Sequence, residues 1–447
     1  MTISTSQDLP SSTPAQQRLT LYCAALVTLC LLVATTEGYD AVAMSLAAPL
    51  LSKSWEITHK MTGVLLTVSV AGMMAGSFLL APLGDRFGRR PTILLSLTVA
   101  GLGTLAGAFA DSYEVMLATR IVAGIGLGSA IPNVLAIAME VVPNRFRTYT
   151  VVLVGCGYPL GAAVGSALVM PLAVEQGHHM IFAVGGIATL AAALACAAFL
   201  PESPSYMRHK PRFAGRLATL TSRLGLQSAA PPAQPAAAAA PQVSPVKALF
   251  SKDYFSITVL IWTIGFANMA IVFFFLSWLP SLLVAKGLDL SVAIKANAMF
   301  NGAGILGGLI LAMAVSRWTS TWVFAICFGV AGAAVLTFAF QSGGPIFWLM
   351  IMLSGACVVG SQFCFTAVAN QFYPAMMRAT GAGYASGAGR LGAIAAPLLG
   401  GWVMQSSGSV ELTFAVAAIP AAIGLAAVIL LQTATNFSAR YRQRSVD

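Results

Sequence analysis

The sequence predicts an all-α polytopic membrane protein whose twelve transmembrane helices form two pseudo-symmetric six-helix bundles. Three features predict this fold class: an apolar composition, a series of long apolar runs and an internal repeat. Of the 447 residues, 58% are hydrophobic and only 9% are charged, and the mean hydropathy is +0.83. Soluble domains carry roughly 25% charged residues on a surface that water must wet. Lipid is therefore the expected solvent for most of this chain.

The long apolar runs mark the expected spans. A helix needs about 20 mainly apolar residues to cross the hydrocarbon core, and it satisfies its own backbone hydrogen bonds there. Such runs occupy residues 21–50, 61–83, 91–110, 113–142, 148–172, 180–200, 253–285, 291–315, 321–341, 345–372, 376–404 and 410–432. The segment that precedes Leu21 lacks the basic start and cleavage site of a signal peptide. The first run is therefore expected to be a true membrane helix.

The net charge of +10 is distributed as a membrane topology requires. With the N-terminus in the cytoplasm, 18 of the 24 Lys and Arg residues fall in cytoplasmic segments. This asymmetry is the positive-inside rule. We therefore expect both termini in the cytoplasm, and we expect no nucleic-acid partner.

A polar stretch divides the spans six and six, and the two sets align with one constant offset along the chain. The expected parts are a tail (1–20), a bundle (21–200), a cytoplasmic linker (201–252), a second bundle (253–432) and a C-terminal tail (433–447). The Ala- and Pro-rich run from Ala229 to Pro245 is typical of a flexible linker. The offset aligns Pro49 with Pro280 and Gly161 with Gly392. Internal repeats of this kind are typical of one class of transporters. In that class the substrate site lies between the two halves, near the bilayer midplane.

The segment Glu37-Gly38-Tyr39-Asp40 places two acids inside the first span. Glu37 and Asp40 are three residues apart, so they share one helix face. Two acids in an apolar helix are costly unless that face lines a cavity. We therefore predict that both take part in proton coupling; the alternative is a structural ion pair with Arg120.

Two arginines lie inside spans, and each needs an anionic partner. Arg120 lies near the outer end of the fourth span, with Glu37 or Asp40 as possible partners or with its head group at the interface. Arg390 lies near the middle of the eleventh span among glycines, and its guanidinium can bind a carboxylate through two hydrogen bonds. We predict that Arg390 contributes to substrate binding; the alternative is a permanent salt bridge to one of the two acids.

Aromatic side chains at the expected cavity depth are candidates to contact a substrate ring. The candidates are Tyr39, Tyr158, Phe266, Phe273, Phe274, Phe275, Phe300 and Tyr384. Of these, the predicted contacts are Tyr39, Tyr158, Phe274 and Tyr384. Aromatic residues in membrane helices more often serve packing or lipid contact, which is the alternative at each of these positions.

The loop Pro82-Leu83-Gly84-Asp85-Arg86-Phe87-Gly88-Arg89-Arg90 joins the second and third spans. Asp85 can lie near a positive helix N-terminus and can pair with arginines, so contacts of Asp85, Arg86 and Arg89 are predicted to act as a gating latch. Glu140 and Arg147 flank the cytoplasmic end of the fourth span and are predicted to join the inner gate. The alternative for the loop is that it only sets topology, and the alternative for Glu140 is a direct proton relay.

No pattern for catalysis or cofactor binding is evident in the sequence. The four histidines lie in loops, the seven cysteines lie within spans without metal-ligand spacing, and no phosphate-binding loop is present. We therefore expect no enzyme activity, no cofactor and no metal, and we interpret the cysteines as apolar packing residues.

The loop from Pro82 to Arg90 and the segment Arg120 to Gly128 resemble signatures of the major facilitator superfamily. Together with the first-span segment Glu37–Asp40, Pro201-Glu202-Ser203-Pro204 and Gly389-Arg390-Leu391-Gly392, they resemble the aromatic acid:proton symporter family. The resemblance implies import of benzoates, hydroxybenzoates or hydroxyphenylpropionates into bacteria, through the inner membrane. It also implies coupling roles for Glu37 and Asp40, and substrate binding or charge balance for Arg120, Glu140 and Arg390. Glu37 departs from the usual aspartate and is more similar to the hydroxyphenylpropionate branch.

The expected function is proton-coupled import of a small aromatic carboxylate by alternating access, with the monomer as the functional unit. The first alternative is a proton antiporter that exports drugs or metabolites, because Gly155 to Gly161 faintly resembles an exporter motif. The others are an importer of non-aromatic acids and a membrane sensor that binds without transport.

Overall fold

A computed structural model describes residues 19–208, 210–225, 245–251, 254–341, 343–374 and 377–444. The first half contains α1 (Leu21–Trp55), α2 (His59–Leu79), α3 (Leu83–Phe87), α4 (Arg89–Gly107), α5 (Tyr113–Glu140), η1 (Asn144–Phe146), α6 (Arg147–Gly155), α7 (Gly157–Val164), η2 (Gly165–Val169), α8 (Met170–Gln176) and α9 (His179–Phe199). The second half contains α13 (Phe255–Ala285), α14 (Leu290–Arg317), α15 (Ser320–Phe340), α16 (Pro345–Ser354), η4 (Gly355–Val359), α17 (Gly360–Gln371), α18 (Arg378–Ser407) and α19 (Val410–Arg444).

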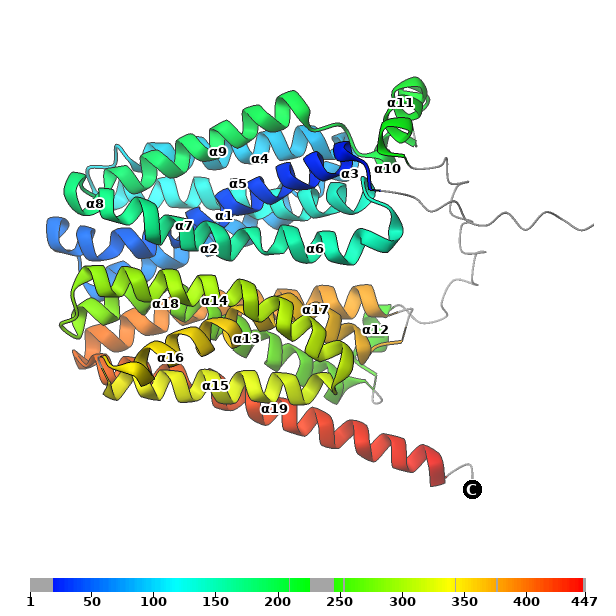
Figure 1. Ribbon diagram of the computed structural model, residues 1–447. Helices are drawn as coiled ribbons and strands as arrows, with labels where there is room; N and C mark the ends of the chain where they lie inside the picture. The colour runs from blue at the N-terminus through cyan, green and yellow to red at the C-terminus, as the bar shows by residue number, and fades with distance from the viewer. Residues whose placement is uncertain are drawn as a thin grey trace, which may run out of the picture.

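The long helices run side by side in two bundles, one above the other in Figure 1. Within the described residues, ten helical segments are long and apolar enough to cross a membrane. Helix α4, which begins with two arginines, and the glycine-rich α18 are not among those ten, yet each packs lengthwise within its bundle. They complete six helical units in each half, and the predicted fold class is confirmed.

The internal repeat is visible in how the helices approach each other. A Cβ atom on Gly161 would lie 1.9 Å from the Thr35 carbonyl oxygen, and one on Gly392 would lie 2.2 Å from the Phe266 carbonyl oxygen. The offset that aligns Gly161 with Gly392 also aligns Thr35 with Phe266. Glycine therefore permits the same close crossing of α1 with α7 and of α13 with α18.

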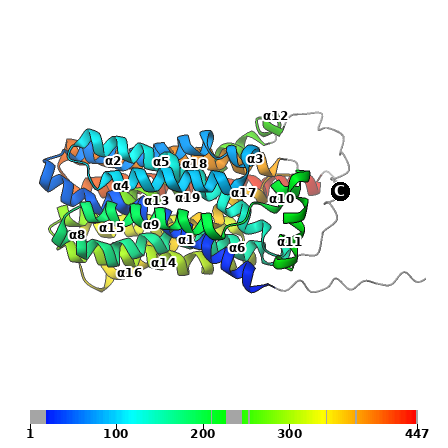
Figure 2. The same ribbon diagram turned by 90° about the horizontal axis from the view of Figure 1, so that it is seen from above.

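One end of the molecule carries α3, α10 (Pro204–Arg208), α11 (Ala214–Leu224) and α12 (Pro245–Leu249) in both views, and we name it the linker side (Figures 1 and 2). The linker is partly helical, which its composition did not predict. Helix α11, which follows the short turn η3 (Pro211–Phe213), buries Leu220 and Leu224 against the first half, and the Cys23 thiol donates to the Leu224 carbonyl. Most of the Ala- and Pro-rich run lies outside the described residues.

On the side opposite the linker, the two halves are in direct contact. A Cβ atom on Gly63 of α2 would lie 2.9 Å from the Pro397 carbonyl oxygen of α18. The His59 amide donates to Gln405 Oε1 at 3.1 Å, and Asn297 of α14 donates to Ser166 of η2 at 2.7 Å. The structure is therefore closed between its halves on this side.

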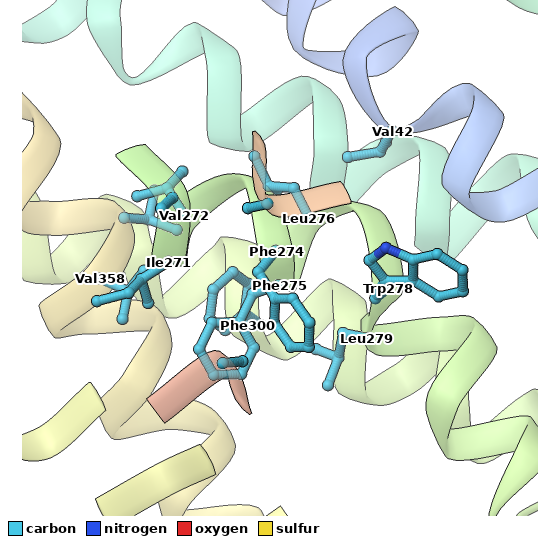
Figure 3. Packing of buried hydrophobic residues seen from close by; sticks show 14 of the residues in the cluster. Val42, Ile271, Val272, Phe274, Phe275, Leu276, Trp278, Leu279, Phe300 and Val358 are labelled. Carbon is cyan, nitrogen blue, oxygen red and sulfur yellow. The ribbon is translucent and has the colours of Figure 1, made fainter. Parts of the chain in front are cut away.

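The core of the second half contains a cluster of aromatic side chains from α13, α14 and α15. The rings of Phe275 and Phe300 lie 5.2 Å apart, and Phe338 packs edge-on against Phe275. Figure 3 shows Phe275 against Phe300 among buried aliphatic side chains. Ring pairs in this geometry contribute about 0.5–1.5 kcal/mol beyond the area they bury, and the cluster gives α13 a rigid position beside the cavity described next.

Candidate functional site

A cavity of about 390 Å³ lies between the two halves, within the size range of small-molecule sites. Its wall comes from α1, α2, α5, α6 and α7 of the first half and from α13, α14, η4, α17 and α18 of the second. The wall is mainly apolar, and its polar or charged members are Glu37, Ser77, Tyr158, Asn301, Gln362 and Arg390. Leu135 and Val151, near the linker-side ends of α5 and α6, also line it. The cavity therefore extends from the middle of the protein toward the linker side.

Four buried polar atoms of this wall have no hydrogen-bond partner within the described part of the chain: Glu37 Oε2, Tyr158 OH, Asn301 Oδ1 and Gln362 Oε1. Arg390 is half-buried and appears in none of the ion pairs between described residues. Arg390 and Glu37 line the same cavity, from α18 and α1 respectively. Unpaired buried polar groups are costly, so this wall is suited to a ligand that carries both an anionic group and hydrogen-bonding groups.

Glu37 and Tyr158 line the cavity where α1 and α7 cross closely at Gly38. A Cβ atom at Gly38 would lie 1.8 Å from the Tyr158 carbonyl oxygen. No side chain fits at that distance without moving the backbone of one helix. The glycine between the acid and the tyrosine in the first-span segment therefore sets the width of the cavity at this point.

We expect Gly38→Ala to destabilise the protein by about 1–3 kcal/mol, the usual cost of overpacking, because α7 must shift. Thermal unfolding in detergent would measure this. Gly215→Ala in α11 is the matched control, since nothing lies within 4 Å of a Cβ at that glycine. Equal melting temperatures for both variants and the parent protein would contradict the assignment of Gly38 to a tight crossing.

Asp40 and Arg120 form a buried ion pair behind the cavity. Arg120 Nη1 lies 3.3 Å from Asp40 Oδ1, and the two side chains are 0% (Arg120) and 2% (Asp40) exposed. Thr104 also donates to Asp40 Oδ1, and the Arg120 guanidinium lies over the Phe182 ring at 4.7 Å. Of the partners that the sequence left open for Arg120, the structure selects Asp40. Neither residue lines the cavity, so the structure does not bring them together with Glu37 and Arg390 in one ligand shell.

The four aromatic residues predicted to contact substrate lie in different environments in the structure. Tyr158 lines the cavity, whereas Tyr39 is buried and donates to the Ile181 carbonyl at 2.7 Å. Phe274 packs with Phe414 in the core of the second half. Tyr384 is 45% exposed and stacks on a tryptophan ring, so only Tyr158 of the four is placed to touch a ligand in this cavity.

Helical periodicity explains why α13 presents a different phenylalanine. Met269, Val272, Phe273 and Leu276 line the cavity, and this spacing of three and four residues is one face of a helix. Phe274 points away from that face into the aromatic core. Phe363 of α17 also lines the cavity, and no signal in the sequence distinguished it from packing aromatics.

The predicted gating residues gather on the linker side, within the first half. Arg89 pairs with Glu140 and lies 3.9 Å from Asp85. Glu140 also accepts from the Ser203 hydroxyl at 2.6 Å and from the first turn of α10. Arg86 and Arg147 are exposed. In this conformation the described contacts tie α4, α5 and α10 together, and none of them reaches the second half.

Sequence reasoning assigned no role to three residues that the structure makes prominent. Glu202 Oε1 accepts from the backbone amides of Arg89 and Arg90 at 2.9 and 3.1 Å, and it thereby caps the positive N-terminus of α4. Asn301 and Gln362 line the cavity. A polar amide inside an apolar span was the available signal for both. Within the described residues, no cluster of His, Cys, Asp and Glu could hold a metal ion.

Comparison with known proteins places this geometry in context. The model of the Major Facilitator Superfamily matches residues 29–397. The 4-hydroxybenzoate transporter PcaK of Pseudomonas aeruginosa is 31% identical over 425 residues, covering 93% of each chain. The 3-(3-hydroxy-phenyl)propionate transporter of Escherichia coli is 29% identical over 423 residues, covering 94% of this chain and 96% of the relative.

Among solved structures, the inward open conformation of the xylose transporter XylE from E. coli superposes with a TM-score of 0.70. The match covers 92% of this chain and 95% of XylE, at 15% sequence identity. At that identity the similarity shows the fold alone.

Proposed function

This chain belongs to the major facilitator superfamily and, within it, to the aromatic acid transporters, and from that premise we propose that it imports a small aromatic carboxylate together with protons. It is a transporter and not an enzyme. The observation that carries the proposal is Arg390, a half-buried guanidinium in an otherwise largely apolar cavity between the halves. A guanidinium binds a carboxylate through two parallel hydrogen bonds, and the apolar wall suits an aromatic ring.

Glu37 supplies the proposed proton site. It shares the cavity with Arg390 and carries an unpaired buried oxygen. When Glu37 is ionised, it competes with the substrate carboxylate for Arg390; when it is protonated, Arg390 is free to hold the substrate. Protonation and substrate binding therefore favour each other, which is the linkage that symport needs.

The proposed orientation puts the linker side in the cytoplasm of a bacterial cell, with both termini on that side, because 18 of the 24 Lys and Arg residues then fall inside. The cavity that extends toward the linker side is then the inward-facing state. Both walls of the cavity come from one chain, so the monomer is the proposed functional unit. Import driven by an inside-negative potential gains about 2.3 kcal/mol per net charge per 100 mV.

The ion pairs among Asp85, Arg89 and Glu140 on the linker side are the proposed gating element. Asp85, Arg89 and Glu140 hold α3, α4 and α5 as one unit while this side is open. Arg86 and Arg147 are exposed here and are proposed to gain partners in the second half when this side closes. Bistable contacts of this kind let two bundles rock between discrete states.

Purified protein in liposomes tests the function. With an acidic outside, labelled 4-hydroxybenzoate is expected to accumulate inside, and a protonophore should abolish the accumulation. Outward movement driven by an inward proton gradient would instead support the antiporter, and binding without flux would support a sensor. Accumulation of non-aromatic acids in preference to the aromatic panel would reject the proposed substrate class.

Arg390→Lys is expected to weaken substrate binding about tenfold or more, because an ammonium keeps the charge but loses the bidentate geometry. The affinity should be measured by competition in the uptake assay. Arg317→Lys, at the linker-side end of α14 and away from the cavity lining, is the matched control. Unchanged affinity in Arg390→Lys would remove Arg390 from the substrate site.

A further inference from the structure

A directed chain of hydrogen bonds ends in the cavity. The Ser166 hydroxyl donates to the Ala162 carbonyl at 2.8 Å, so its oxygen is left to accept from Asn297 Nδ2 at 2.7 Å. Asn301 Nδ2 in turn donates to the Asn297 backbone oxygen at 2.9 Å and lies 3.4 Å from Asn297 Oδ1. The printed donors of this chain therefore all point from Asn301 toward Asn297 and from Asn297 toward Ser166.

The direction of the chain fixes the orientation of the Asn301 amide. Turning the amide over would place its oxygen against the two oxygens of Asn297, acceptor against acceptor. Asn301 Oδ1 is therefore the free end of the chain. The residue is 0% exposed, it lines the cavity, and Oδ1 has no donor within the described residues.

Gln362 adds a second amide to the same half of the cavity. It comes from α17, whereas Asn301 comes from α14, and its buried Oε1 atom also has no donor among the described residues. The second half thus offers Arg390 for a carboxylate and two amide oxygens for hydrogen-bond donors. A benzoate ion has no hydrogen-bond donor for these two amide oxygens, whereas a hydroxybenzoate ion can donate from its ring hydroxyl.

We propose that Asn301, assisted by Gln362, selects aromatic acids that carry a hydrogen-bond donor on the ring over those that carry none. The inference rests on the proposed function. It adds that the cavity recognises a hydrogen-bond donor on the ring of the substrate. A site built to bond a hydroxyl discriminates strongly against the analogue without it, because the buried acceptor is then left unpaired.

The wild-type protein in liposomes provides the first test. Uptake of 3- and 4-hydroxybenzoate should be compared with uptake of 3- and 4-fluorobenzoate, which are similar in size but have no donor. We expect at least one hydroxylated acid to be preferred about tenfold or more over its fluoro counterpart. Equal uptake of both classes would overturn this inference and leave the proposed function intact, whereas uptake of neither class would overturn the proposed function.

Two variants assign the selectivity to residues. Asn301→Leu and Gln362→Met keep the approximate side-chain volume and remove the acceptor, so the preference for the hydroxylated acid should fall several-fold, most in Asn301→Leu. Asn268→Leu is the matched control, because Asn268 is also buried with an unpaired Oδ1 but lines a separate small cavity. It should change the uptake of both classes equally.

A preference that survives in Asn301→Leu would exclude Asn301 as the selecting residue. A parallel loss of both classes in that variant would reduce Asn301 to a structural role and overturn the proposal as well. Should Asn301→Leu fail to fold, Asn301→Ala removes the same acceptor without adding volume, and the same ratio of uptake rates decides.

Discussion

Replacing Glu37 by glutamine is expected to abolish accumulation of substrate against its gradient while exchange of substrate across the membrane continues. Glutamine keeps the shape of the side chain but cannot bind and release a proton. Arg390 then has no competing carboxylate in the cavity, so substrate binds but its release is no longer tied to deprotonation. Exchange requires only movement of the loaded protein, which does not need that step.

The measurement compares two modes in the same liposomes: accumulation driven by a pH gradient, and exchange of labelled for unlabelled substrate at equal pH. We expect accumulation to disappear in Glu37→Gln, with exchange within about threefold of the parent. Glu114→Gln, an exposed glutamate in the first turn of α5, should change neither. Parent-like accumulation in Glu37→Gln would mean that another group carries the proton.

Asp40→Asn is expected to destabilise the protein by about 3–5 kcal/mol, the usual cost of leaving one partner of a buried ion pair uncompensated. Arg120 is 0% exposed and has Asp40 as its anionic partner in the structure. The neutral amide cannot balance that charge, and the buried guanidinium has no contact with water that would replace the lost partner. We also expect proton-driven accumulation to be lost.

Thermal unfolding in detergent separates the structural contribution from the transport contribution. Asp40→Asn combined with Arg120→Met should recover most of the stability, because replacing both buried charges by neutral groups is often neutral or stabilising. If the double variant recovers stability but not accumulation, the Asp40–Arg120 pair also takes part in transport. If it recovers both, the pair is only structural; if the single variant melts like the parent, the ion pair contributes little.

The two acids of the first span thus have different surroundings, although they lie three residues apart on one helix. Glu37 faces the cavity and Arg390, whereas Asp40 faces Arg120, Thr104 and the first half. The sequence showed that both were unusual but could not separate them. The difference arises because α5 brings Arg120 to Asp40, and a contact between distant helices is not encoded in local spacing.

The sequence by itself determined the fold class, the repeat and which charged residues lie inside the spans. Hydropathy determines these features because lipid permits few backbone arrangements, so apolar runs become helices almost regardless of context. The constant offset between the halves aligned Gly161 with Gly392, and the structure shows that both lie at close helix crossings.

Only the tertiary structure decided which side chains face the cavity. Phe273 lines it and Phe274 does not, although they are neighbours in the chain. Asn301 became a candidate only when Asn297 and Ser166 of the opposite half were seen to fix its amide. Which way a helix is rotated depends on the packing of its neighbours, and in a nearly uniform apolar span the sequence carries little record of that rotation.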